Sequence, residues 1–201
     1  MKKMNRINKI LEITKKYGVI RPRDLDRYQI PRNYITRLYQ RGLLQRVGRG
    51  LYVNPDSDVS ENHTLAQVAK RIPNGIICLI SALQYHGLTT QIAHEVWVAI
   101  ERTARYPREP ELPFRIVRFS GVALRNGVEE HTIEGVLVKV YNIPKTIADC
   151  FKYRNKIGFD VAMEALRECR RYKKCTIDEL WHFAKICRVA NIMRPYMEAI
   201  Q

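Results

Sequence analysis

The chain has 201 residues, which is enough for one large domain or two small ones. With 46% hydrophobic and 27% charged residues, its composition excludes intrinsic disorder over most of its length. No stretch approaches the ~18 uninterrupted apolar residues of a membrane-spanning helix, and the basic N-terminus leads into a charged amphipathic segment and not into a signal-peptide core. The five cysteines lack the spacing of zinc or thioredoxin-like sites, so we interpret them as reduced thiols in a cytoplasmic protein.

The first part of the chain has the element order of a winged helix-turn-helix domain. Tyr17 and Gly18 end one helical pattern, Pro22 and Pro31 each suit the first turn of a helix, and the glycines around Arg49 indicate a hairpin turn. We therefore predict a DNA-binding domain over residues 1–54, with helices 4–16, 22–28 and 31–41 and strands 43–47 and 51–53.

The segment 54–58 has the Asn-Pro pair and the polar composition of a linker. The rest of the chain, residues 60–201, reads as an α/β domain with a helical C-terminal third, so the fold class of the whole chain is mixed α+β. The predicted elements are helix 62–72, strand 76–80, a short helix from Ser81 to His86, strands 95–100, 114–119, 128–133 and 136–141, and helices 145–153, 160–171, 176–187 and 191–200.

Positive charge is concentrated at the N-terminus. Residues 1–53 contain 14 Lys and Arg against three acids, a net charge of +11, whereas the remaining residues contribute +4 to the total of +15. Such asymmetry indicates a module that binds a polyanion. A membrane surface is the other common polyanion, but it would require exposed bulky apolar residues on an amphipathic helix, and the sequence has no such helix.

The predicted helix 31–41 has the features of a DNA-reading helix. Ile35 and Leu38 lie on one face, where they would pack on the first two helices, and polar residues lie on the opposite face. Arg pairs with guanine, Asn or Gln pairs with adenine, and Thr contacts the thymine methyl group, so this face could read base edges. Alternatively, the face is simply solvated. The candidate base-reading residues are Arg32, Asn33, Thr36, Arg37 and Gln40.

Further basic residues suit contacts to the DNA backbone. Arginines at the tip of a wing can enter a narrow minor groove, and phosphate contacts position a protein without specifying a sequence. The candidates for the wing and the backbone are Lys2, Lys3, Arg6, Arg21, Arg23, Arg41, Arg46 and Arg49. A second basic loop with an aromatic residue is either solvated or a secondary nucleic-acid contact, formed by Arg102, Arg105, Tyr106 and Arg108.

Residues 19–25 and 34–52 resemble the winged helix of the AbiEi antitoxin family, and residues 81–88 and 141–154 resemble that family's C-terminal domain. The resemblance implies a transcriptional repressor that binds inverted repeats upstream of its own operon. It also implies a type IV antitoxin that counteracts a nucleotidyltransferase-like toxin without forming a stable complex with it. Such antitoxins are associated with abortive infection, a defence against phage. The C-terminal domain would carry the antitoxin activity.

No arrangement of residues indicates catalysis. The histidines lack metal-binding spacing, and Ser81 lacks the context of a hydrolase nucleophile. A nuclease of the acid-x-Lys type would need an acid two residues before Lys139, but that position is Leu137. Asp149 shares a helix with two lysines, and we interpret it as a structural acid. We therefore expect no enzyme activity, no metal and no cofactor.

The sequence thus predicts a DNA-binding repressor, with antitoxin activity implied by the resemblance. One winged helix makes few base contacts, so we expect two copies to bind repeated half-sites in double-stranded DNA. This mode is compatible with a monomer in solution that binds cooperatively. Two alternatives remain open: a ligand-responsive repressor with no toxin partner, and a nucleic-acid-processing enzyme to which the winged helix delivers substrate.

Overall fold

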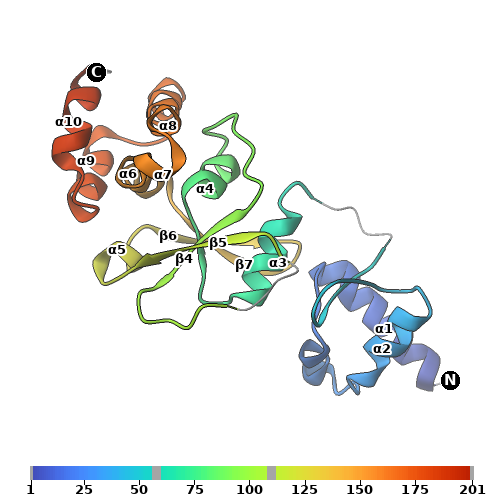
Figure 1. Ribbon diagram of the computed structural model, residues 1–201. Helices are drawn as coiled ribbons and strands as arrows, with labels where there is room; N and C mark the ends of the chain where they lie inside the picture. The colour runs from blue at the N-terminus through green and yellow to red at the C-terminus, as the bar shows by residue number, and fades with distance from the viewer. Residues whose placement is uncertain (1, 56–59, 108–111, 200–201) are drawn as a thin grey trace. The chain divides into compact units, whose positions relative to one another are not determined.

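The computed structural model describes residues 2–55, 60–107 and 112–199, with side chains from Arg6 onward (Figure 1). The described residues fall into two compact units. The first unit comprises Met1–Pro73, Pro107–Leu112 and Thr132–Val138, and the second comprises Asn74–Tyr106, Pro113–His131 and Lys139–Gln201.

The first unit begins with three helices and a two-stranded hairpin, which confirms the predicted order of a winged helix-turn-helix. Its elements are α1 (Lys2–Tyr17), the 3-10 helix η1 (Pro22–Tyr28), α2 (Asn33–Gln40), β1 (Gln45–Gly48), β2 (Leu51–Val53) and α3 (His63–Arg71). Ile20 bridges to Tyr52 through two backbone hydrogen bonds of 2.9 Å, so the chain after α1 lies beside the hairpin. One apolar core unites these helices, formed by Ile10, Ile13, Ile20, Leu25, Ile30, Tyr34, Ile35, Leu38 and Leu44.

A tight turn at Glu134 and Gly135 packs against the C-terminal end of α1. A Cβ atom on Gly135 would lie 2.6 Å from Tyr17 Cα, and one on Gly18 would lie 2.6 Å from Glu134 Cβ, so both glycines allow close backbone approach. The Glu134 carboxylate accepts hydrogen bonds from the Ser60 amide (3.0 Å) and hydroxyl (2.8 Å), and its other oxygen lies 2.7 Å from His63 Nδ1. This turn therefore joins α1 and the start of α3.

We expect Glu134→Gln to loosen the first unit at neutral pH. Burial opposes ionisation of Glu134, but its hydrogen bonds with His63 and Ser60 prevail and lower its pKa. A depressed carboxyl pKa contributes stability above the pKa of the unfolded state, and that contribution is lost as the pH falls through the folded-state value. Hydrogen–deuterium exchange of α1 and α3 should be faster in the variant, because the unit loses about 1–2 kcal/mol of stability at pH 7. The difference in exchange rate between the variant and the wild type should vanish in acid. The exposed Glu130→Gln serves as the control, and equal effects from both substitutions would contradict this prediction.

In the described part of the chain, the second sheet has five strands in the order β5-β4-β3-β7-β6. These are β3 (Ile76–Ile77), β4 (Val96–Glu101), β5 (Phe114–Phe119), β6 (Val128–Ile133) and β7 (Val136–Tyr141). β3 pairs antiparallel with β4 and parallel with β7, and β4 pairs parallel with β5 over all six of its residues. The sheet is therefore mixed, with β5 and β6 at its edges.

Helices dominate the C-terminal third, as predicted (Figure 1). α6 (Ile143–Lys152) packs against α4 (Leu79–Tyr85), α8 (Phe159–Arg171) and α9 (Ile177–Ile186). Its apolar face joins the large core of the second unit. Asn142 caps α6 by accepting from the Lys145 amide, and Thr176 and Glu179 form the capping box of α9. The helices are α4 (Leu79–Tyr85), α5 (Val122–Arg125), α6 (Ile143–Lys152), α7 (Arg154–Ile157), α8 (Phe159–Arg171), α9 (Ile177–Ile186) and α10 (Ala190–Ala199).

The predicted strand 76–80 is wrong at its C-terminal end. The strand ends at Ile77, and Leu79 adopts a φ of 48° and begins α4, two residues before the predicted start at Ser81. The apolar run continues across this turn because Leu79 and the following helix are also buried. Burial in both elements therefore hides the boundary between strand and helix.

Candidate nucleic-acid interface

Helix α2 separates a buried face from an exposed polar face. Tyr34, Ile35 and Leu38 are buried in the core of the winged helix, which fixes the orientation of α2. The opposite side chains are exposed, and they include four of the five predicted base-reading residues: Asn33, Thr36, Arg37 and Gln40. Sequence periodicity thus places these residues together on one accessible surface.

Arg37 is held by a ring on its own helix. Its guanidinium carbon lies 5.6 Å from the centroid of the Tyr34 ring, within range of a cation–π interaction. Beyond the C-terminal end of the helix, Arg41 is exposed, and its amide donates to the Arg37 carbonyl. The basic face therefore continues from α2 toward the hairpin.

Arg32, the fifth candidate, immediately precedes α2 and is ion-paired. Its Nε donates to Asp26 Oδ1 (2.9 Å), and its Nη2 donates to the second carboxylate oxygen. The hydrogen bond from Arg32 lowers the pKa of Asp26, and the same bond raises the pKa of Arg32. Asp26 is not among the residues predicted from the sequence; its position within η1, six residues before Arg32, is the signal that could have identified it.

The wing is a short hairpin with a register shift between Arg46 and Gly48. Arg46 Nε donates to the Gly48 carbonyl (3.1 Å), so its side chain is hydrogen-bonded to the backbone of its own strand. Arg49 is exposed in the turn, and its carbonyl accepts from Arg71 Nη1 of α3 (2.6 Å). The contact from α3 therefore anchors the backbone of the wing tip and leaves the Arg49 side chain exposed.

The other residues predicted to contact the DNA backbone differ in their exposure to solvent. Arg6 and Arg23 are exposed, whereas Arg21 is half-buried and its amide donates to Asp24 (2.9 Å). Lys2 and Lys3 begin α1, but their side chains lie outside the described residues. Arg6 and Arg23 are therefore the more accessible of the described candidates in this group.

The second basic loop follows β4 and is organised by a residue on β5. Arg118 Nη1 donates to the carbonyls of Arg102 (2.6 Å) and Ala104 (2.8 Å), a role that the sequence analysis missed. The side chains of Arg102, Arg105 and Tyr106 are exposed. Tyr106 also contacts the Phe114 ring at 6.3 Å between centroids, and Arg108 lies outside the described residues.

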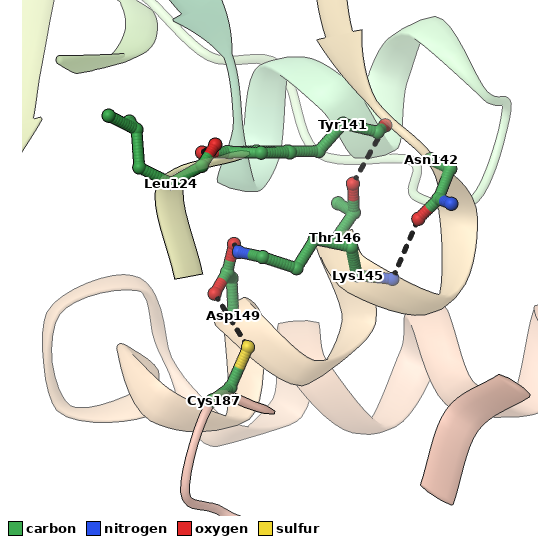
Figure 2. Close-up of polar contacts among 7 residues, drawn as sticks. All are labelled: Leu124, Tyr141, Asn142, Lys145, Thr146, Asp149 and Cys187. Atoms are coloured by element: carbon green, nitrogen blue, oxygen red, sulfur yellow. Dashed lines mark hydrogen bonds and ion pairs between the residues drawn. The ribbon is translucent and has the colours of Figure 1, made fainter. Parts of the chain in front are cut away.

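The segment 141–154 contains a buried polar cluster (Figure 2). Lys145 Nζ donates to Asp149 Oδ2, and both side chains are essentially inaccessible to solvent. Cys187 donates through its thiol to the other Asp149 oxygen (3.2 Å). The Lys145 ammonium also lies 4.1 Å from the centroid of the Tyr141 ring and 4.7 Å from that of Phe119. Burial raises the pKa of Asp149, and Lys145 limits the rise.

The surrounding hydrogen bonds fix the junction between β7 and α6. Tyr141 donates from its hydroxyl to the Leu124 carbonyl (2.8 Å), and Thr146 Oγ1 donates to the Tyr141 carbonyl (3.1 Å). Burial raises the pKa of the Cys187 thiol to about 12, so this thiol is protonated and can donate at neutral pH. Asp149 is therefore buried and paired, as expected of a structural acid that shares a helix with two lysines.

The described residues contain no cluster of three or more His, Cys, Asp or Glu side chains placed to hold a metal ion. Among the same residues, no helix is both long and apolar enough to cross a membrane. All five cysteines are free, and four of them are buried.

Comparison with known proteins bears on the N-terminal region. No curated protein matches the chain. A protein-family model does match residues 8–55, a stretch that begins within α1 and contains η1, α2 and the hairpin. Over residues 8–55 the chain is thus similar to a family described as "Transcriptional regulator, AbiEi antitoxin".

Proposed function

We propose that this protein is a sequence-specific DNA-binding repressor of its own operon and an antitoxin that counteracts a nucleotidyltransferase-like toxin in the cytoplasm. The observation that carries the proposal is the exposed polar face of α2, within a winged helix that matches a family of regulators. We assign DNA binding to residues 1–54 and antitoxin activity to residues 60–201, without enzymatic chemistry and without a stable complex with the toxin.

In this proposal the side chains act in three groups. Residues at and before α2 read base edges, which specifies the sequence, whereas basic residues around them contact phosphates and the minor groove. The exposed loop with Arg102, Arg105 and Tyr106 is a secondary nucleic-acid contact. Two copies on an inverted repeat would occlude the promoter, and the second copy would supply the specificity that one winged helix lacks.

A cavity supports a second candidate, a ligand-responsive repressor. It measures about 150 Å³ and is lined by Ile13, Tyr17, Ile20, Asp24, Arg27, Tyr28, Lys70 and Gly135. Asp24 and Lys70 form an ion pair of 2.8 Å at this cavity. An effector that entered here could alter how α3 contacts η1, and loss of DNA binding on addition of a small molecule would favour this candidate.

We expect the double variant Thr36→Ala/Arg37→Ala to abolish repression of a reporter driven by the DNA upstream of the gene. Both side chains are exposed on α2, so their removal eliminates base contacts without disturbing the core. The substitution Lys185→Ala, on an exposed position of α9, should repress as the wild type does. Full repression by the double variant would show that α2 is not the reader.

The antitoxin activity is tested in the same cells. When the adjacent gene is expressed alone, growth should stop, and coexpression of the wild-type chain should restore growth. The double variant Thr36→Ala/Arg37→Ala should restore growth equally well, because we assign antitoxin activity to residues 60–201. Failure of the wild-type chain to restore growth would contradict the antitoxin proposal and leave the repressor proposal intact.

A further inference from the structure

The ion pair between Asp26 and Arg32 lies where a recognition helix approaches bases. Arg32 directly precedes α2, and the N-terminal half of a recognition helix is the part nearest the base edges. The two side chains are 50% and 61% exposed, respectively, so the pair lies on the surface and not in the core. Its position therefore calls for an explanation other than packing.

The geometry of the pair leaves one edge of the guanidinium available. Arginine has five N–H donors, and Asp26 accepts one from Nε and one from Nη2. Both hydrogens of Nη1 and the second hydrogen of Nη2 remain, and one hydrogen from each of these two nitrogens forms a pair of parallel donors on the outer edge. That edge matches the O6 and N7 acceptors of guanine in the major groove.

Holding the guanidinium in this way has a predictable consequence for selectivity. A free arginine loses rotamer entropy when it binds a base, and it can turn to a phosphate instead. An arginine already fixed by a carboxylate has lost part of that freedom, so its contact depends more on which base it meets. The carboxylate also repels nearby phosphates, which weakens binding to DNA of any sequence.

The other acids of the strongly basic region have different partners. Among the three acids of residues 1–53, Glu12 pairs with Lys9 in α1, and Asp24 pairs with Lys70. Only Asp26 of these three is paired, in the described structure, with a residue predicted to read bases. The negative charge is thus located where it can affect sequence selection.

We infer that Asp26 is a specificity-determining residue, which positions Arg32 to read a single guanine and reduces binding to non-specific DNA. The inference rests on the proposed DNA-binding function. It adds a role for a carboxylate that touches no base itself but acts through the arginine that it orients.

Selection from a library of randomised duplexes tests the inference with the full chain. The wild type should enrich a defined motif. Arg32→Ala should lose the preference for one guanine by about 5- to 150-fold, the range of one bidentate base contact. Asp26→Asn should weaken the preference at that same position, because an amide has one carbonyl acceptor in place of two carboxylate oxygens. It should also bind a random duplex about two- to fivefold more tightly.

Glu12→Gln is the matched control, because it removes the same negative charge from an exposed site in α1. It should leave the motif unchanged. If Asp26→Asn retains the guanine preference that Arg32→Ala loses, or loses preference at another position, the inference about Asp26 is overturned while the proposed function stands. If the wild type enriches no motif, the proposed sequence-specific function fails, and the inference fails with it.

Discussion

Replacing Arg37 by alanine is expected to weaken binding of the preferred duplex by about 5- to 150-fold and to relax the preference at one base pair. The side chain is exposed on α2, and the Tyr34 ring beneath it restricts its orientation. Removing it therefore eliminates a contact to a base edge without creating a cavity in the winged-helix core. Fluorescence anisotropy with the preferred duplex and with single-base variants measures both effects.

Arg49→Ala provides the contrasting variant for the same titrations. Arg49 is anchored through its carbonyl by Arg71, so the substitution should remove a charge from the wing without moving the backbone. Binding should weaken by the same factor for all duplexes. The slope of log K against log salt concentration should become shallower by about one unit. If both variants bind as the wild type does, neither α2 nor the wing contacts DNA in the way we propose.

The second large effect is expected in the second unit, where Asp149→Ala should reduce the free energy of unfolding by about 3–5 kcal/mol. The substitution leaves the Lys145 ammonium buried without its carboxylate partner, and the Cys187 thiol loses its acceptor. Both tryptophans, Trp97 and Trp181, lie in the second unit, so their fluorescence during urea unfolding reports on this part of the chain.

A double substitution distinguishes a lost ion pair from a lost packing volume. Lys145→Met/Asp149→Leu replaces both charges by apolar side chains of similar size, and such replacements of buried pairs are often neutral or stabilising. The double variant should therefore be more stable than Asp149→Ala. A double variant that is less stable than Asp149→Ala would show that the pair contributes net stability beyond the cost of a single unpaired charge.

Periodicity and turn residues predicted most of the fold. The helical spacing of Ile35 and Leu38 identified the buried face of α2, and the glycines flanking Arg49 identified the wing. Thr176 and Glu179 form the capping box that their spacing predicts. These signals are local, so a single sequence contains them in full.

Features that depend on distant residues escaped the sequence analysis. The contacts of Glu134 with Ser60 and His63 join residues more than 70 positions apart, and no local pattern indicates them. Arg118 fixes the loop after β4 through backbone carbonyls, which every residue possesses and which therefore leave no signal in the sequence. The short helices α5 and α7 have four residues each, too few for a helical period to be recognised.

The most direct test of the central claim is a binding titration of the purified protein with DNA from upstream of its own gene, beside a scrambled duplex, at 50 and 200 mM salt. We predict a preference of about 10³-fold or more for the upstream DNA that persists at the higher salt concentration. Equal and steeply salt-dependent binding to both duplexes would mean that the +11 charge of residues 1–53 acts only electrostatically, and it would contradict the account of a sequence-specific repressor.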